Sequence, residues 1–306
     1  MQGWPVIEGR VHARVQLVVN KSIRVRAART IMLSVAKGLS LITGNPIAQR
    51  CLEWGVVRAQ YLMGIGSGGV VANSGEKIAL SLAIAGHGGG SHGDRRATSP
   101  VCIFDVGANI GQFSGVAKAV LMGHPYTIHC FEPGRHTFDR LRENIGDDNS
   151  FRLNNIALGA NVGSASLFYD KAGSGLASMT KRNLEHFKID FSQSESVSVD
   201  TVDNYCDRAR IDKIDLLKMD VEGHELDVLR GAARLLEDRR IGAILFEFGG
   251  CNIDTRSFLQ DYFYFFKKYS PNRMFRITPS GYLSPLDSYR EIDEQFRTTN
   301  FLVRFS

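Results

Sequence analysis

The 306-residue sequence is short of cysteine and lacks a long hydrophobic run. Its five cysteines are odd in number, lie far apart and form no Cys-x-x-Cys pair, so a disulfide framework is not expected and a reducing, cytoplasmic setting is favoured. A helix that spans a bilayer needs about 18 apolar residues in a row. The longest stretch without a charge, 59–75, contains five glycines and is not expected to cross a membrane.

The net positive charge of the sequence is confined to its N-terminal segment. Residues 1–60 hold nine Lys or Arg against two Glu, a net +7, whereas the remaining 246 residues hold 28 basic and 30 acidic groups, a net −2. This balance excludes a nucleic-acid-binding surface over the main body. Residues 1–85 are predicted to form a basic N-terminal helical arm or cap, and weak contact with acidic lipid headgroups or a polyanion is the alternative role for its basic face.

The chain beyond residue 85 divides into a linker and a domain. Residues 86–93 contain five glycines and two histidines, too flexible a composition for a regular element, so 86–99 is predicted to be a linker. Over 100–306 apolar runs alternate with amphipathic stretches, which is typical of a parallel sheet with helices on both faces. Strands are predicted near 101–106, 126–131, 151–158, 164–169, 214–219, 241–248, 273–278 and 301–305, and helices over 111–122, 136–145, 201–209, 225–237 and 258–269.

A glycine turn follows the first strand of this domain. The segment Asp105-Val106-Gly107-Ala108-Asn109-Ile110-Gly111 lies where a buried strand becomes a helix. Parallel sheets bind ligands at the carboxyl ends of their strands, and glycine lets a ligand approach the backbone closely. Gly107 and Gly111 are four residues apart, which does not match the G-x-G-x-x-G pattern of dinucleotide-binding proteins. The turn predicts a nucleotide-like cofactor and disfavours a nicotinamide dinucleotide.

A carboxylate follows the second strand. Phe131-Glu132-Pro133 comes 21 residues after Gly111, counted to Glu132. At the end of that strand a carboxylate can accept hydrogen bonds from both hydroxyls of a ribose. Together with the glycine turn, Glu132 therefore predicts a ribose-binding site rather than a residue that merely caps a helix.

Several segments together resemble the FkbM-type S-adenosylmethionine-dependent methyltransferases. They are Asp105 to Gly111, Phe131-Glu132-Pro133, Ala157-Leu158-Gly159 and the run Leu217-Lys218-Met219-Asp220-Val221-Glu222-Gly223-His224-Glu225. The resemblance covers about residues 60–306 and leaves the basic arm and the glycine-histidine tract unassigned. It implies an α/β, Rossmann-like class I methyltransferase fold. That fold has a seven-stranded, mostly parallel sheet with one antiparallel strand in its last pair and helices on both faces.

The resemblance also implies a cofactor site. The residues expected to bind S-adenosyl-L-methionine are Asp105, Gly107, Ala108, Asn109, Gly111, Glu132, Asn155, Ile156, Ala157 and Asp220. The glycine turn would contact the methionine part, Glu132 the ribose, and 155–157 the adenine, with Asn154 as the alternative to Asn155. No metal ligand is expected in this site.

Catalysis asks for alignment of an acceptor and for a base, because the sulfonium already activates the methyl group. His224 is the first candidate for the base and Glu222 the second, both just after the fourth strand of the parallel sheet. Glu247, at the end of the fifth strand, is a further candidate for the base or a substrate ligand. The alternatives are that Asp220 anchors the loop, Glu222 caps a helix, His224 moves no proton, and Glu247 is a buried, paired acid.

These features predict an S-adenosylmethionine-dependent O-methyltransferase that acts on a hydroxyl of a sugar, polysaccharide unit or secondary metabolite. Its partner would be a small-molecule or glycan acceptor and not nucleic acid. The loop 173–179 is predicted to be a lid over the site, or else a plain surface loop. The rival predictions are an NAD-dependent Rossmann oxidoreductase and a non-catalytic module that binds the cofactor or a polyanion.

Overall fold

The computed structural model describes residues 37–38, 40, 42–69, 74–84 and 100–305. The chain divides into two compact units, Met1–Ala59 and Gln60–Ser306. Helix α2 (Pro46–Leu62) begins in the first unit and buries none of its residues. The predicted arm before residue 37 and the predicted linker lie outside the described residues. Within the described part of the chain, no helix is both long and apolar enough to cross a membrane.

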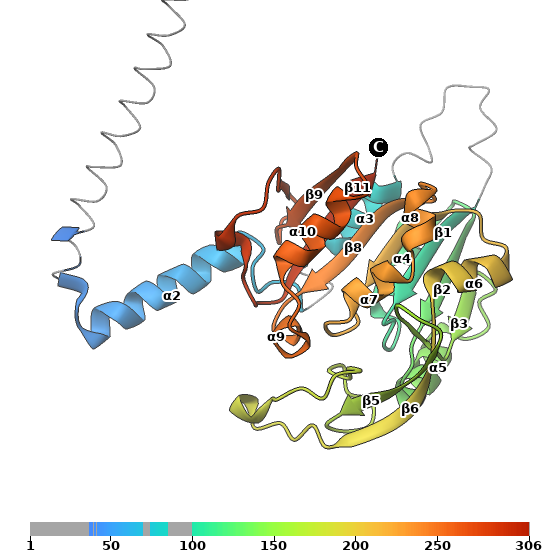
Figure 1. The fold of residues 1–306 in the computed structure, drawn as a ribbon, viewed down its shortest axis with the longest axis horizontal. Helices are drawn as coiled ribbons and strands as arrows, with labels where there is room; N and C mark the ends of the chain where they lie inside the picture. Colours follow the sequence, from blue (N-terminus) through green and yellow to red (C-terminus); the bar gives the residue numbers. More distant parts are fainter. Residues whose placement is uncertain (1–36, 39, 41, 70–73, 85–99, 306) are drawn as a thin grey trace, which may run out of the picture. The chain divides into compact units, whose positions relative to one another are not determined.

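An eight-stranded sheet forms the centre of the second unit, in the order β10-β9-β11-β8-β7-β1-β2-β3 (Figure 1). The strands are β1 (Val101–Val106), β2 (Tyr126–Phe131), β3 (Phe151–Asn154), β7 (Ile214–Met219), β8 (Ile241–Phe248), β9 (Asn272–Ile277), β10 (Leu283–Pro285) and β11 (Thr299–Phe305). Five adjacent strands of this sheet run parallel to one another, in the order β8-β7-β1-β2-β3. Strand β11 is antiparallel to both of its neighbours, β8 and β9. Burial on both faces explains why the parallel strands are nearly continuous apolar runs.

The mostly parallel sheet predicted from the sequence is confirmed, with one strand more than the seven expected. The additional strand, β10, has three residues and pairs antiparallel with β9 at the edge of the sheet. It ends at Pro285, which has no backbone N–H to offer a further strand. A strand this short has no alternation that a sequence pattern can reveal.

Helices cover both faces of the sheet, as predicted. They are α3 (Glu76–Ile84), α4 (Gln112–Val120), α5 (Arg135–Ile145), α6 (Val202–Ala209), α7 (Glu225–Arg230), α8 (Ala233–Glu237), α9 (Cys251–Thr255) and α10 (Leu259–Lys267), with short 3-10 turns η3 (Glu185–Phe187) and η4 (Glu291–Asp293). Helices α6, α7, α8 and α10 pack into the apolar core on one face, and α3, α4 and α5 into that on the other. The carboxyl edge of the parallel strands stays available for polar groups.

A second, three-stranded sheet was not predicted. Its order is β4-β6-β5, with β4 (Ala157–Leu158), β5 (Gly163–Tyr169) and β6 (Gln193–Asp200). The single strand predicted over 151–158 is wrong, because the chain leaves the main sheet after Asn154 and enters the second sheet at Ala157. Half of the side chains of β6 are exposed or half-buried serine and glutamate, and only two are apolar, so this strand carries too few apolar residues to be recognised.

The single helix predicted over 225–237 is also wrong, because it is two helices joined at Gly231. A Cβ atom at Gly231 would collide with the carbonyl oxygen of Gly159. The close approach of these two backbones requires glycine and separates α7 from α8.

Candidate active site

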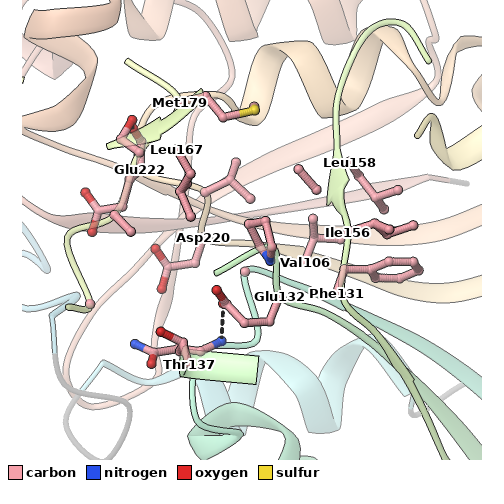
Figure 2. Close-up of a pocket in the computed structure, with 18 of the residues that line it drawn as sticks. Val106, Phe131, Glu132, Thr137, Ile156, Leu158, Leu167, Met179, Asp220 and Glu222 are labelled. Atoms are coloured by element: carbon pink, nitrogen blue, oxygen red, sulfur yellow. Dashed lines mark hydrogen bonds between the residues drawn. The ribbon is translucent and has the colours of Figure 1, made fainter. Parts of the chain in front are cut away.

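A pocket opens at the carboxyl edge of β1, β2 and β7. It is lined by the turn after β1, Glu132-Pro133 after β2, the segment 156–158, the loop 174–179, and the segment 220–222 after β7 (Figure 2). These segments are far apart in the sequence, and the parallel topology brings them to one edge.

The glycine turn has the close backbone approach that its sequence predicts. Gly107 has a φ of 73°, and a Cβ atom there would collide with the carbonyl oxygen of Asp220. Gly107 and Asn109 line the pocket. Ala108 is instead buried in the core, and Gly111, with a φ of 88°, precedes α4 and packs against Leu141. Of the turn after β1, Gly107 and Asn109 therefore form part of the pocket wall.

Asp105 lies beneath the turn and not in the pocket lining. It is fully buried; its Oδ2 accepts a hydrogen bond of 2.7 Å from Ser114 Oγ, and its Oδ1 lies 3.1 Å from Lys218 Nζ. Lys218 Nζ also donates to the carbonyl oxygen of Gly107 at 3.3 Å and lies 3.8 Å from Asp220 Oδ2. Burial opposes the charge of Lys218, but the nearby carboxylates outweigh burial and raise its pKa. Lys218 thus fixes the turn to the end of β7.

Lys218 was not singled out from the sequence as a site residue. The signal for it was a lysine inside the buried strand β7, whose residues other than Lys218 and Asp215 are all apolar. A fully buried lysine is rare unless it is paired. Its nearer partner, Asp105, lies on the neighbouring strand β1, more than a hundred residues away in the chain, so the sequence alone did not show the pair.

Glu132 connects two sides of the pocket. Its Oε2 accepts a hydrogen bond of 3.0 Å from the backbone N–H of Asn109, and its Oε1 accepts one of 3.0 Å from Gly134 (Figure 2 shows the bond to the glycine turn). Burial raises the pKa of Glu132 to about 7. Each carboxylate oxygen keeps acceptor capacity for a ligand, because it can accept more than one hydrogen bond.

The predicted adenine segment is only partly in the pocket. Ile156 and Ala157 line it, together with Leu158 and Leu167. Asn155 is not among the lining residues. Its Nδ2 donates to the carbonyl oxygens of the two residues after β2, at 2.9 Å each. Asn155 therefore shapes this side of the pocket by holding the backbone, and an apolar strip of side chains forms the surface.

The loop after β7 brings Asp220 and Glu222 into the pocket but not His224. Glu222 has a φ of 52°, and burial together with the charge of Asp220 raises its pKa to about 8. Both ring nitrogens of His224 are engaged: Nδ1 lies 2.9 Å from Asp227 Oδ2, and Nε2 lies 3.0 Å from Thr180 Oγ1. His224 thus joins the loop to its neighbours and does not line the pocket.

Glu225, directly after these residues, anchors the loop. Its Oε1 accepts hydrogen bonds from the backbone N–H groups of Val221 and Gly223, and its Oε2 accepts one of 3.1 Å from Tyr262 Oη. The sequence analysis did not assign a role to Glu225. Its partner Tyr262 lies in α10, within an aromatic run that reads as ordinary core.

The loop predicted to be a lid contacts the far side of the pocket. Ser178 Oγ donates to the carbonyl oxygen of Glu222 at 2.9 Å. Arg182 lies 2.6 Å from Glu222 Oε2 and 3.3 Å from Asp254 Oδ2, and its side chain is 8% exposed. Figure 2 shows Met179 of the same loop above the pocket. These contacts link the loop to the strand ends that form the base of the pocket.

Glu247 is not among the pocket-lining residues. It lies in β8, the strand next to β7, and makes no hydrogen bond or ion pair with a residue that the structure describes. Burial, followed by the charges of Asp220 and Glu222, raises its pKa well above the ordinary value. Among the described residues, no group of three or more His, Cys, Asp or Glu side chains is arranged to hold a metal ion.

Comparison with known proteins assigns the chain to a family. The family model described as the methyltransferase FkbM domain matches residues 105–273, more than half of the chain. The protein belongs to the FkbM methyltransferase family. This match confirms the resemblance found in the sequence motifs, and it contains the glycine turn, Glu132, the lid loop and the loop after β7.

Two related methyltransferases match the chain over shorter stretches. The 2-O-methyltransferase NoeI of Sinorhizobium fredii is 30% identical over 148 residues, 45% of this FkbM-family chain and 60% of that protein. The hexuronic acid methyltransferase AglP of Haloferax volcanii is 29% identical over 135 residues, 44% of this chain and 51% of that protein. The chain thus spans between half and three fifths of these curated relatives. A crystal structure of methyltransferase FkbM from Methylobacillus flagellatus KT has a TM-score of 0.42 at 17% identity, over 66% of this chain and 43% of that one.

Buried carboxyls in this FkbM-family chain make its stability depend on pH. Burial raises the pKa of Glu76 and Glu132 to about 7 and that of Glu222 to about 8, from an ordinary value of 4.5. The folded protein therefore keeps protons that the unfolded chain has already released, and ionisation of these groups destabilises the fold as the pH rises. We expect the free energy of unfolding to fall by about 2 kcal/mol between about pH 6.5 and pH 8.

Denaturant titrations at the two pH values measure this change. Burial lowers the pKa of His129 to about 4, so below the ordinary histidine pKa of about 6.5 this residue makes the free energy of unfolding rise with pH. The measurement therefore starts at about pH 6.5, where the carboxyls alone determine the trend. Glu222→Gln should make the fall with pH shallower. Stability that rises across the window would contradict the assignment of these protons to the folded state.

Proposed function

We propose that the protein is an S-adenosylmethionine-dependent O-methyltransferase that acts on a hydroxyl of a sugar, polysaccharide unit or secondary metabolite. The observation that carries this proposal is one pocket in which a glycine turn, a buried carboxyl and an apolar strip meet at the carboxyl edge of a parallel sheet. Two relatives over part of their length are named as a 2-O-methyltransferase and a hexuronic acid methyltransferase, which supports a sugar acceptor.

The residues of the pocket suit S-adenosylmethionine. Glycine at position 107 lets the turn pack closely against the carbonyl oxygen of Asp220 while its backbone lines the pocket, where it can contact the amino acid part of the ligand. Glu132 is placed to accept hydrogen bonds from ribose hydroxyls, and Ile156 and Leu158 offer an apolar surface to a flat base. The carboxylates of Asp220 and Glu222 favour a positively charged ligand at the remaining side.

S-adenosylmethionine supplies a methyl group that its positive sulfur already activates, and a hydroxyl acceptor must lose a proton as the new bond forms. The chain's own task is to orient the acceptor, exclude water with the lid loop, and receive that proton. Of the predicted bases, His224 has both nitrogens engaged and Glu222 is paired with Arg182. Glu247 has no such partner among the described residues, so we assign the proton to it.

The cofactor assignment is tested by Glu132→Gln. The substitution keeps one oxygen for the backbone N–H groups and removes the charge, so it should weaken binding of S-adenosylmethionine by about 1–3 kcal/mol while the fold is kept. Calorimetric titration at about pH 8, above the pKa of about 7 for Glu132, measures this loss. Glu143→Gln, an exposed glutamate on α5, is the matched control and should leave affinity unchanged. Equal affinity of both variants would remove Glu132 from the ribose site.

The activity itself is tested with methyl-labelled S-adenosylmethionine and a panel of methyl glycosides. We expect label to appear on at least one sugar, at an oxygen, in the presence of the wild-type chain. Cofactor binding without transfer to any member of the panel would favour the non-catalytic alternative. Reduction or oxidation of an acceptor with a nicotinamide cofactor would favour the dehydrogenase alternative instead.

A further inference from the structure

Two polar side chains next to the pocket have unused hydrogen-bonding groups, as far as the described residues show. Glu247 of β8 and Asn300 of β11 lie directly opposite each other in the antiparallel pairing of these strands. Asn300 is 3% exposed, and its side-chain nitrogen has no hydrogen-bond partner in the part of the chain that the structure describes. Glu247 makes no hydrogen bond or ion pair with the described residues. A buried amide without a partner is unusual in a native fold and calls for an explanation.

The pair lies on one face of the sheet, at the edge where the pocket opens. Residues opposite each other in a ladder project to the same side. Two positions further into the sheet, Leu245 and Leu302 form the next such pair on this face and pack in the core that includes α3 and α4. β7 is the other neighbour of β8, and Asp220 directly after it lines the pocket. Glu247 and Asn300 therefore continue the polar edge beyond the pocket lining.

The chemistry of the two groups is complementary, yet they do not bond to each other. The amide of Asn300 offers an N–H donor, and the carboxyl of Glu247 offers oxygen acceptors. A hydroxyl group is both donor and acceptor, so one hydroxyl between them can donate to Glu247 and accept from Asn300. Such a ligand would satisfy the buried amide nitrogen, which none of the described residues engages.

The charges around the pair favour an uncharged ligand. Burial raises the pKa of Glu247, and the charges of Asp220 and Glu222 raise it further. The two buried cations that the structure describes at this edge are each engaged by two carboxylates: Lys218 by Asp105 and Asp220, and Arg182 by Glu222 and Asp254. Neither of these two cations is left to receive a carboxylate of the acceptor.

We propose that Glu247 and Asn300 bind a hydroxyl group of an uncharged sugar acceptor. Glu247 accepts the hydrogen bond from the hydroxyl, and Asn300 donates one to its oxygen. The proposal rests on the proposed function, because it concerns the acceptor of the same site. It adds Asn300, to which the sequence analysis gave no role, and it excludes an anionic sugar as the preferred acceptor.

Sugar binding tests the proposal directly. The probes are methyl β-D-glucopyranoside and glucuronic acid, titrated by saturation-transfer NMR into the full chain with S-adenosylhomocysteine present. We expect the neutral sugar to bind at least tenfold more tightly than the acid, and Asn300→Leu to weaken the neutral sugar at least tenfold. Absence of binding of the neutral sugar to the wild type, equal binding of both sugars, or full binding by Asn300→Leu would each overturn the proposal.

A stability measurement separates a ligand-binding amide from a structural one. Leucine has nearly the same shape as asparagine, so Asn300→Leu should leave Tm unchanged or raise it, because the amide nitrogen has no hydrogen-bond partner among the residues that the structure describes. The matched control is Asn252→Leu, also buried, whose side chain bonds to Gly249, Ser257 and Tyr262. That control should lower Tm clearly. An equal loss of Tm in both variants would make Asn300 structural and overturn the proposal.

The affinity for S-adenosylhomocysteine, measured on the same samples, separates failure of the proposed function from failure of the hydroxyl site alone. If the wild type does not bind it, the proposed function fails. If the wild type and Asn300→Leu bind it equally while sugar binding is unaffected by the substitution, the proposed function stands and the hydroxyl site is rejected.

Discussion

Lys218→Met is expected to lower the free energy of unfolding by about 3–5 kcal/mol, the scale for removing one partner of a buried ion pair. Lys218 lies 3.1 Å from Asp105 Oδ1, and both side chains are almost fully buried. Methionine fills a similar volume but leaves the carboxylate of Asp105 without a counterion in the core. The hydrogen bond from Lys218 to the carbonyl oxygen of Gly107 is lost as well, so the turn under the pocket loses its support.

Lys118→Met is the control for an exposed ion pair, and denaturant unfolding of both variants measures the two losses of stability. Lys118 pairs with Asp148 at 2.7 Å, but its side chain is 53% exposed, and exposed pairs contribute at most about 1 kcal/mol. A loss at position 218 no larger than that at position 118 would contradict the account of the buried pair. Asp105→Asn combined with Lys218→Met should recover part of the loss, because it removes the unpaired charge.

Gly107→Ala is expected to destabilise the protein by about 2–5 kcal/mol and to abolish measurable binding of S-adenosylmethionine. Two effects combine: the left-handed backbone at a φ of 73° disfavours alanine, and the new methyl group collides with the carbonyl oxygen of Asp220. Relief of the collision moves β1 away from the end of β7. The two strand ends that form the base of the pocket would then no longer meet.

Gly123→Ala isolates the first of these effects. Gly123 has a φ of 90°, but a Cβ atom there would meet no atom within 4 Å. Its substitution should therefore cost only the backbone term of about 1–2 kcal/mol and leave cofactor binding intact. Equal effects at positions 107 and 123, in melting curves and in calorimetry, would show that the contact with Asp220 does not matter.

The parts of the fold that the sequence predicted are those with a local signal. The buried strands β1, β2, β7 and β8 are apolar runs between helices with amphipathic patterns, and their order along the chain is enough to predict a parallel sheet. The glycine turn and Glu132 follow from the same logic, because chemistry gathers at the carboxyl ends of such strands. These features depend on neighbours in sequence.

The parts that were missed depend on distant contacts. β6 is a polar strand that exists because β5 pairs with it, and the break at Gly231 is set by the backbone of Gly159. The pairing of Lys218 with Asp105, and of Arg182 with Glu222, joins residues that only the folded topology brings together. For the same reason the sequence ranked His224 first among the bases, whereas Asp227 and Thr180 engage both of its nitrogens in the structure.

The measurement that tests the central claim most directly is calorimetric titration of the purified chain with S-adenosylhomocysteine and, separately, with NADH. We expect micromolar binding of S-adenosylhomocysteine and no measurable binding of NADH. This expectation follows from the glycine spacing, from the close approach of Gly107 to the backbone of Asp220 and from the buried Glu132. Binding of NADH without S-adenosylhomocysteine would contradict the account and identify the pocket as a dinucleotide site.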